Sequence, residues 1–330
     1  MNKLQLFTMI LLIVCAQTAF PNVPKTVVKG NVIFVLDGLN TEKTTKYINQ
    51  LKSFVWDADI RVTSLEDLPK SSSTAKRSII IAIGPKAFSN ALDRKSNIPI
   101  VSVFTSRTLY YKIKEQHHSN YRKTTAIFAD SDLNDQIALI TGIYNRSISV
   151  GVLLTQPNLG YKSELILLAD EYEIKIHIEI LQSGNDIYRS LNTLTAKGVD
   201  AILAIPDADI FNKSTMPGIV LSTYKNDQSI IGFSDKLVQA GSLASVYYLP
   251  KHVAIDTNSI VSVYFSNGYI GEEHFSKNFN VAVNKSVARS LNLYKNNPTE
   301  LVSRVKKNVN FKDKSFEFVF MDSRTTETVL

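Results

Sequence analysis

The stretch that decides the fold reads IIGFSDKLVQAGSLASVYY at residues 230–248 and NFNVAVNKSVARSLNL at residues 278–293, with a long amphipathic segment between them. The first part is an apolar strand followed by a turn of small residues, and the last part contains one more apolar strand. A helix that runs back across the molecule would join the two. This order of strand, small-residue turn, return helix and final strand is typical of the closing section of a hinged fold with two lobes.

Length and composition agree with a globular protein of two domains. The chain of 330 residues exceeds the roughly 100 to 200 residues of a usual domain. Hydrophobic residues make up 44% and charged residues 20%, which argues against wholesale disorder. The net charge is +7, but the 37 Lys and Arg residues are scattered along the chain. We therefore expect a solvated basic surface and no nucleic-acid partner.

The N-terminus is typical of a signal peptide, which we assign to residues 1–19. Lys3 precedes an apolar run at residues 4–14. This run is shorter than the roughly 20 residues that span a bilayer, but it suits the apolar region of a signal. No later segment has about 18 consecutive apolar residues, so the sequence predicts no other membrane span.

Two ways of processing this signal are open. Cleavage after Ala16 or Ala19 would release the protein into the periplasm. Lipid attachment at Cys15 is the less favoured alternative, because Val14 stands where a small residue is usual. Cys15 is the only cysteine, so a chain cleaved beyond it would have no disulfide and no thiol catalyst.

Apolar runs that indicate buried strands alternate with helical periods along the rest of the chain, which predicts parallel sheets with helices on both faces. In the first lobe we expect strands at 32–36, 60–63, 78–83 and 98–104, a helix at 44–54 and a surface loop at 112–123. In the second lobe we expect strands at 150–154, 175–180, 201–205, 218–221 and 230–233, with helices at 134–144, 162–172 and 191–197.

The fold class is thus α/β, with two Rossmann-like lobes joined by a hinge that the chain crosses several times. A helix at 254–266 and a strand at 280–283 follow the second sheet, and we expect them to return to the first lobe and the hinge. We assign residues 26–125 plus 250–275 to lobe 1, 126–249 plus 276–293 to lobe 2, and 294–330 to a C-terminal extension. That extension is expected to hold a basic helix at 299–307, an edge strand at 316–320 and a frayed end at 322–330.

Five short segments in matching order resemble the type I periplasmic binding fold, and specifically the substrate-binding proteins of uncharacterised ABC-type uptake systems. Residues 80–87 are similar to their strand followed by Gly-x-x-Ala, and residues 283–288 to their closing Val-Asn-x-x-x-Ala. The other three segments are residues 148–154, 199–207 and 239–245. The resemblance runs from about residue 32 to residue 293 and implies a monomeric, exported receptor; the few studied relatives bind aromatic amino acids.

The sequence departs from this family at three places near the expected cleft. Residues 127–132 replace a Thr-Gly pair before the first helix of the second lobe. Asp207-Ala208 stands where relatives have an Asp-Asn pair that helps to hold the ligand's amino group. Residues 248–252 replace a Tyr-x-x-Leu-Gly segment before the return helix. The departures put amino-acid specificity in doubt but leave the fold unaffected.

Candidate ligand-binding residues lie in the loops after the strands, because ligands of parallel α/β sheets bind at the carboxyl ends of the strands. Gly84 and Pro85 begin a helix whose free N–H groups would favour a carboxylate, or they form only a tight turn. Asp207 would pair with a ligand ammonium or cap the next helix. Phe104 would stack on a ligand or complete the core. The full candidate set is Asp37, Gly38, Gly84, Pro85, Phe104, Thr105, Ser106, Thr155, Gln156, Asp207, Ser234 and Asp235.

The sequence predicts no catalytic residues, no metal site and no cofactor. It has no G-x-S-x-G, H-E-x-x-H, complete P-loop or G-x-G-x-x-G motif. His117 and His118 are adjacent, and adjacent residues on a helix do not face one another, so a shared metal is not expected.

These features favour an exported solute-binding protein of an ABC-type uptake system. Such a protein would close its lobes on a small ligand, an amino acid being one candidate, and present both lobes to a membrane permease. The alternative is a periplasmic sensory module that reports occupancy of the same cleft to a membrane partner.

Overall fold

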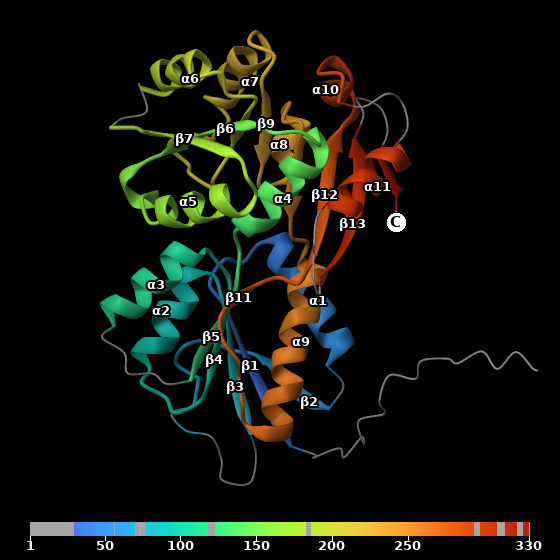
Figure 1. The fold of residues 1–330 in the computed structure, drawn as a ribbon. Coiled ribbons are helices and arrows are strands. Elements are labelled where there is room, and N and C mark those ends of the chain that lie inside the picture. Colours follow the sequence, from blue (N-terminus) through green and yellow to red (C-terminus); the bar gives the residue numbers. More distant parts are fainter. Residues whose placement is uncertain are drawn as a thin grey trace, which may run out of the picture.

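Two α/β lobes, one above the other in Figure 1, make up the protein in this computed structural model. The described residues are 30–55, 57–69, 71, 77–117, 123–182, 186–293, 298–308, 314–321 and 326–329. The expected signal peptide, with Cys15, lies outside them, as does His118. No helix within these ranges combines the length and the apolar character that a membrane crossing requires.

The first lobe is built on a six-stranded parallel sheet with the order β11-β5-β4-β3-β1-β2. Its strands are β1 (Asn31–Asp37), β2 (Ala58–Val62), β3 (Ser78–Ile83), β4 (Ile100–Thr105), β5 (Thr124–Phe128) and β11 (His274–Phe275). Its helices are α1 (Glu42–Phe54), α2 (Pro85–Asp93), α3 (Arg107–Gln116) and α9 (Pro250–Asn267). The predicted boundary between residues 125 and 126 falls inside β5.

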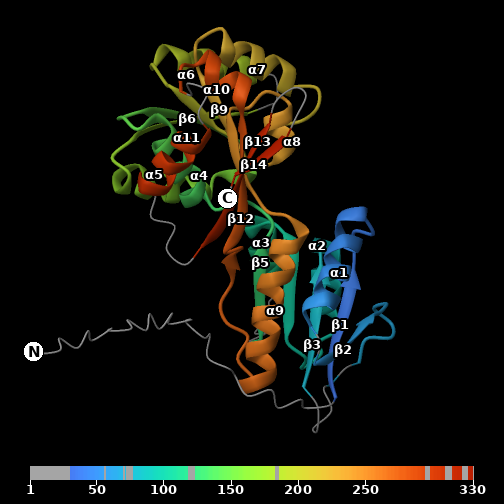
Figure 2. The same ribbon diagram turned by 90° about the vertical axis from the view of Figure 1, so that its right-hand side faces the viewer.

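Both faces of the central strands are buried, which explains why β1, β3 and β4 are apolar without alternation. In β3, Ile79 and Ile81 belong to the core beneath α1 and α9, whereas Ile80 and Ala82 belong to the core beneath α2 and α3. Figure 2 shows α9 lying lengthwise against the lower sheet beside α1.

The second lobe is built on an eight-stranded sheet with the order β14-β13-β12-β10-β9-β8-β6-β7. Its strands are β6 (Ser149–Leu154), β7 (Lys175–Ile180), β8 (Ala201–Leu203), β9 (Ser229–Gly232), β10 (Ala244–Tyr247), β12 (Asn278–Asn284), β13 (Ser315–Met321) and β14 (Thr326–Val329). Its helices are α4 (Leu133–Tyr144), α5 (Tyr161–Glu171), α6 (Ile187–Ala196), α7 (Met216–Tyr224), α8 (Asp235–Gln239), α10 (Lys285–Ser290) and α11 (Pro298–Asn308), with a 3-10 turn η1 (Gln156–Asn158). The sheet is mixed, because β12 runs antiparallel to β10 and β14 antiparallel to β13.

The chain crosses between the lobes three times, from β5 to α4, from β10 to α9 and from β11 to β12. The helix that we expected at 254–266 does return to the first lobe, where α9 packs against α1. The strand expected at 280–283 does not, because β12 pairs with β10 in the second sheet. The third crossing therefore returns the chain to the second lobe, where β12, β13 and β14 join the sheet.

Two segments have a different local structure from the one predicted. Residues 218–221 are helical, in α7, and not a strand. Ile219 and Thr223, four residues apart, are buried while Leu221 is 54% exposed, a period that the short apolar run concealed. Residues 112–116 end α3 rather than forming a loop, because Tyr110 and Ile113 supply a buried face among the charges.

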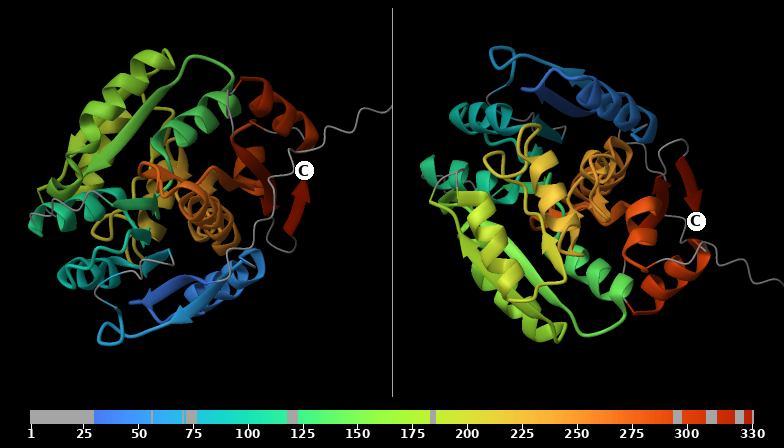
Figure 3. Two further views of the ribbon diagram at one scale, coloured as in Figure 1. Left: turned by 90° about the horizontal axis from the view of Figure 1, so that it is seen from below. Right: turned by 90° about the horizontal axis from the view of Figure 1, so that it is seen from above.

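The C-terminal extension is integrated into the second lobe. Figure 3 shows α11, β13 and β14 along the outer side of that lobe, with α11 next to α4. A methyl group on Gly142 of α4 would lie 3.0 Å from the Cα of Val305 in α11, so the glycine allows the two helices to approach closely. The predicted edge strand at 316–320 is interior, because β14 covers it. Residues 326–329, expected to be frayed, form that covering strand.

We expect Phe318→Ala to lower the free energy of unfolding by about 3–5 kcal/mol, because it would leave a large cavity in the core. Phe318 is fully buried on the same face of β13 as Phe316 and Phe320. Phe316→Ala is the matched control, since this ring is only partly buried, and its cost should be clearly smaller. Urea denaturation measures both, and a loss below about 1 kcal/mol for Phe318→Ala would contradict the docking of β13.

Candidate functional site

The predicted ligand-binding residues lie at the carboxyl ends of strands, in the loops that follow them, or at the first residue of the next helix or 3-10 turn. In the first lobe these loops follow β1, β3 and β4, and in the second lobe they follow β6, β8 and β9. The chain leaves the first lobe after the carboxyl end of β5 and leaves the second lobe after the carboxyl end of β10, so these edges of the two sheets face one another. The predicted residues of the first lobe and those of the second lobe therefore lie on opposite sides of the boundary between the lobes.

The loop after β1 is held by its own aspartate. The Asp37 carboxylate accepts hydrogen bonds from the backbone N–H groups of Leu39 and Asn40 at 2.9 and 3.0 Å, and from the Thr44 hydroxyl at 2.8 Å. The Gly38 N–H donates to the Ile83 carbonyl at 3.0 Å. These bonds fix the loop to the first turn of α1 and to β3, so Asp37 already has a structural role.

The turn at Gly84 allows two loops to pack together. Gly84 has a φ of 85°, a left-handed conformation that glycine adopts without strain. A Cβ there would lie 2.7 Å from the Leu39 Cγ atom, and one on Gly38 would lie 2.9 Å from the Ala87 nitrogen. The β1–α1 loop thus lies directly on the first turn of α2, which Pro85 begins. The proposed carboxylate-binding role of this turn stays a prediction.

The exit of β4 has a strained backbone. Phe104 has a φ of 56° at a point where the register between β4 and β5 shifts, as in a β-bulge. Such a conformation is unusual for an aromatic residue and costs of order 1–3 kcal/mol. The ring lies edge-on to Tyr47 at 5.2 Å between centroids, and the Lys43 ammonium lies 5.2 Å from the Phe104 centroid.

The two residues after Phe104 have local partners. Thr105 is buried and accepts a hydrogen bond from the Ser102 hydroxyl at 3.1 Å. The Ser106 hydroxyl accepts from the Leu109 N–H at 3.4 Å and so caps α3.

In the second lobe, Asp207 ties two strand exits together. Its Oδ2 atom accepts hydrogen bonds from the Thr155 hydroxyl at 2.5 Å and the Asn158 amide at 2.7 Å, both in the loop after β6. Its Oδ1 atom accepts from the Asp209 N–H at 2.9 Å. Asp207 is thus a structural bridge, with part of its acceptor capacity still open to a ligand. Gln156, in the same loop, is exposed.

Ser234 and Asp235 begin α8 at the exit of β9. The Ser234 hydroxyl accepts from the Leu237 N–H at 3.3 Å and caps the helix. Asp235 is partly buried. Burial lowers the pKa of Lys43 on α1 in the first lobe, and the negative charge of Asp235 opposes this shift. Of the predicted set, Asp235 is the residue whose charge acts across the boundary between the lobes.

Arg107 joins the two lobes directly, and sequence reasoning missed it. Its guanidinium forms an ion pair with Glu164 of α5 and lies over the rings of Tyr161 and Phe275, at 4.9 and 5.2 Å from their centroids. Its backbone N–H donates to Asp130 at 2.7 Å, and the Tyr161 hydroxyl donates to the same carboxylate at 2.9 Å. Its only signal in the sequence was its place directly after Ser106.

The first two crossings are hydrogen-bonded to one another. The Ser131 hydroxyl donates to the Val246 carbonyl at 2.6 Å, and the Asp132 N–H donates to the Tyr248 hydroxyl at 3.2 Å. These bonds involve two of the places where the sequence departs from the resembled family.

A buried charge cluster lies at the start of α4. The Lys314 ammonium, just before β13, pairs with Asp132 at 3.0 Å and with the fully buried Asp135 at 2.7 Å. Burial and the neighbouring Asp132 charge raise the pKa of Asp135 from 3.8 to about 6, although Lys314 opposes the shift. The C-terminal segment thereby supplies a cation that two carboxylates beside the first crossing require.

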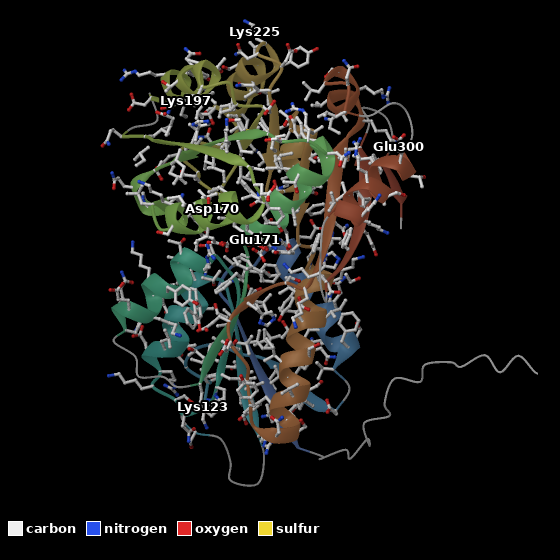
Figure 4. The ribbon with its side chains drawn as sticks, viewed as in Figure 1. Lys123, Asp170, Glu171, Lys197, Lys225 and Glu300 are labelled. Carbon is white, nitrogen blue, oxygen red and sulfur yellow. The ribbon has the colours of Figure 1, made fainter. Side chains whose placement is uncertain are left out.

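Charged side chains far from these loops are dispersed. Figure 4 shows Lys197 and Lys225 at the end of the second lobe away from the first, and Lys123 low on the first lobe. These three do not form one basic surface, which agrees with the scattering of charge along the sequence.

Comparisons with known proteins identify the fold. No family model matches the chain, and no curated protein matches it. Solved structures do. A ligand-free, open substrate-binding protein with adhesive properties from Clostridium difficile is 14% identical over 87% of this chain and 98% of its own, with a TM-score of 0.61. An ABC domain in complex with L-Trp from Streptococcus pneumonia is 14% identical over 85% and 99%, with a TM-score of 0.52.

A conserved domain protein from Vibrio cholerae is 16% identical over 84% of this chain and 98% of its own, with a TM-score of 0.50. These likenesses concern the fold, because the identities are low. The chain therefore has the two-lobed α/β fold of ABC-transporter substrate-binding proteins, as the sequence predicted.

We expect Asp207→Ala to lower the free energy of unfolding by about 1–3 kcal/mol, because three hydrogen bonds lose their acceptor. Asp209→Ala is the control, since Asp209 is exposed and its backbone N–H remains. Urea unfolding of both variants measures the difference. Equal stability of the two would show that the bridge between the β6 and β8 exits contributes nothing.

Acidification from about pH 7.5 to about pH 5 should stabilise the wild-type protein relative to Asp135→Asn. The pKa of Asp135 is about 6 in the folded chain and has its ordinary value of 3.8 in the unfolded chain. Between pH 3.8 and about pH 6, the folded chain therefore holds a proton on this carboxyl group that the unfolded chain has lost. The free energy of unfolding due to this group therefore falls as pH rises through that window. Unfolding titrations at both pH values test this, and identical pH dependence in the two proteins would refute it.

Proposed function

We propose that the protein is the exported solute-binding component of an ABC-type uptake system. The observation that supports this proposal is that polar residues follow the carboxyl ends of strands in both lobes of a fold shared with substrate-binding proteins. On this proposal the protein acts by capture and release, without a catalytic step. A signal peptide at residues 1–19 would deliver it as a monomer to the periplasm, where a permease receives the ligand.

Closure of the lobes is the proposed mechanism of capture. Three crossings link the lobes, and short segments of this kind can absorb a hinge motion. Hydrogen bonds within the loop after β1 and around Asp207 fix each half of the proposed site. Closure would therefore change the distance between the two halves more than it changes the conformation of either half.

The proposed ligand is a small polar metabolite, with an amino acid as the first candidate. One protein of the same fold was solved with L-Trp, which is a statement about that protein. In this chain Asp207 and Asp235 provide carboxylates at second-lobe exits, and either would bind a ligand ammonium by a charge-assisted hydrogen bond.

We expect a screen of amino acids, sugars and related metabolites against the mature protein to find a ligand that raises the melting temperature. A ligand at about 100 times its Kd adds about 2.7 kcal/mol to the free energy of unfolding. Small-angle X-ray scattering should show a smaller radius of gyration when that ligand is bound. Failure of every solute to stabilise the protein would contradict the proposal.

For an amine-bearing ligand, Asp207→Ala should abolish the shift, measured against the variant's own melting temperature. An unchanged shift would leave Asp207 only its structural role.

A further inference from the structure

Lys43 differs from the neighbouring lysine on the same helix. Lys46, one turn along α1, pairs with Glu42 at 2.7 Å on the exposed surface. Among the described residues, Lys43 has no carboxylate within ion-pair distance, and its ammonium lies over the Phe104 ring. The first turn of α1 therefore presents a cation whose hydrogen-bonding capacity is open.

The surroundings of Lys43 come from both lobes. The Lys43 side chain is exposed, although partial burial by the surrounding protein lowers its pKa. Asp235 opposes this change and Lys236 adds to it, and both belong to α8 in the second lobe. Lys43 is in the first turn of α1, and α1 reaches the boundary between the lobes from the first-lobe side (Figure 1).

Phe104 holds this ammonium in place. The left-handed backbone at Phe104 and the register shift beside it turn the ring toward Tyr47 and Lys43. A cation over an aromatic face is attracted by the ring. Backbone strain of this kind persists only where the surrounding structure enforces it, and it is concentrated at functional sites.

We propose that Lys43 is the anion-recognition residue of the site between the lobes, and that the ligand is an organic anion whose carboxylate binds the Lys43 ammonium. Phe104 is the positioning residue that orients the ammonium. The ligand's carboxylate would be the ion-pair partner that Lys43 lacks among the described residues. The negative charge of Asp235 disfavours a ligand that carries a second negative charge. This inference rests on the proposed function and deepens it by naming the class of ligand.

The test uses a panel of monocarboxylates, each beside its neutral primary amide, together with neutral sugars. Thermal unfolding of the full mature protein identifies the probes that bind, and titration calorimetry gives their affinities. We expect at least one carboxylate to bind while its amide does not. Lys43→Met should then weaken that carboxylate by about tenfold to a hundredfold, as for loss of a charge-assisted hydrogen bond.

Matched variants separate recognition from general charge and from folding. Lys46→Met removes the same charge from the same helix and should leave the affinity unchanged. Lys43→Arg keeps the charge and should retain most of the binding. Phe104→Leu should weaken the carboxylate about two- to fivefold and Phe104→Tyr should restore it, a pattern that mere support of the fold would not produce.

The outcomes distinguish this inference from the function on which it rests. Binding of a sugar or an amide without any carboxylate would overturn the role of Lys43 and leave a solute receptor. Carboxylate binding that Lys43→Met and Lys46→Met weaken equally would overturn it too. Binding of no probe, in this panel or in the wider solute screen, would overturn both.

Discussion

The parallel sheet imposes the constraint on which the rest of the structure depends. Strands that run in one direction and are buried on both faces need a helix after nearly every strand, and each strand-to-helix loop then opens at the same edge. In the first lobe helices follow β1, β3 and β4, whereas β2 leads to β3 without a helix among the described residues; the second lobe obeys the rule from β6 to β10. When two such edges face one another, loops from both lobes lie in one region. The path of the backbone alone determines this, whatever side chains the loops carry.

Contacts at the crossings and at the lobe boundary determine how those edges meet. Asp132 at the first crossing contacts Tyr248 at the second, and Lys314 brings the C-terminal segment to the same point. Arg107 and Glu164 join the lobes at a different place, between α3 and α5. A hinge built in this way is anchored through partly buried charges, so removal of one partner would leave the other without its counter-charge.

The first-lobe exits combine a strained backbone at Phe104 with a cation, Lys43, over its ring. The Asp37 carboxylate accepts hydrogen bonds from its own loop and from the first turn of α1. The Lys43 ammonium lies over the Phe104 ring and has no carboxylate partner among the described residues. The Asp37 carboxylate is thus used within its own loop, whereas Lys43 is the proposed recognition group. In the second lobe, Asp207 combines both possibilities, since it bridges two loops and retains acceptor capacity.

Much of the fold was predictable because its signal is local. Buried strands such as β3 have continuous apolar runs, and α1 shows its period through Tyr47 and Leu51. The error at residues 218–221 arose because a short apolar run does not separate strand from helix. Candidate residues were found by their position after strands, but Lys43 and Arg107 were missed because nothing in their local sequence distinguishes them from other basic residues.

The sequence by itself determined the alternation of strands and helices, the two-lobed α/β class and the loops that could hold a ligand. Periodicity and turn chemistry act over a few residues and can be read directly. Only the tertiary structure decided that the C-terminal strands complete the second sheet, that Lys314 pairs with Asp132 and Asp135, and that Lys43 lies over the ring of Phe104. Asp132 and Lys314 are 182 positions apart, and local sequence carries no record of contacts over such distances.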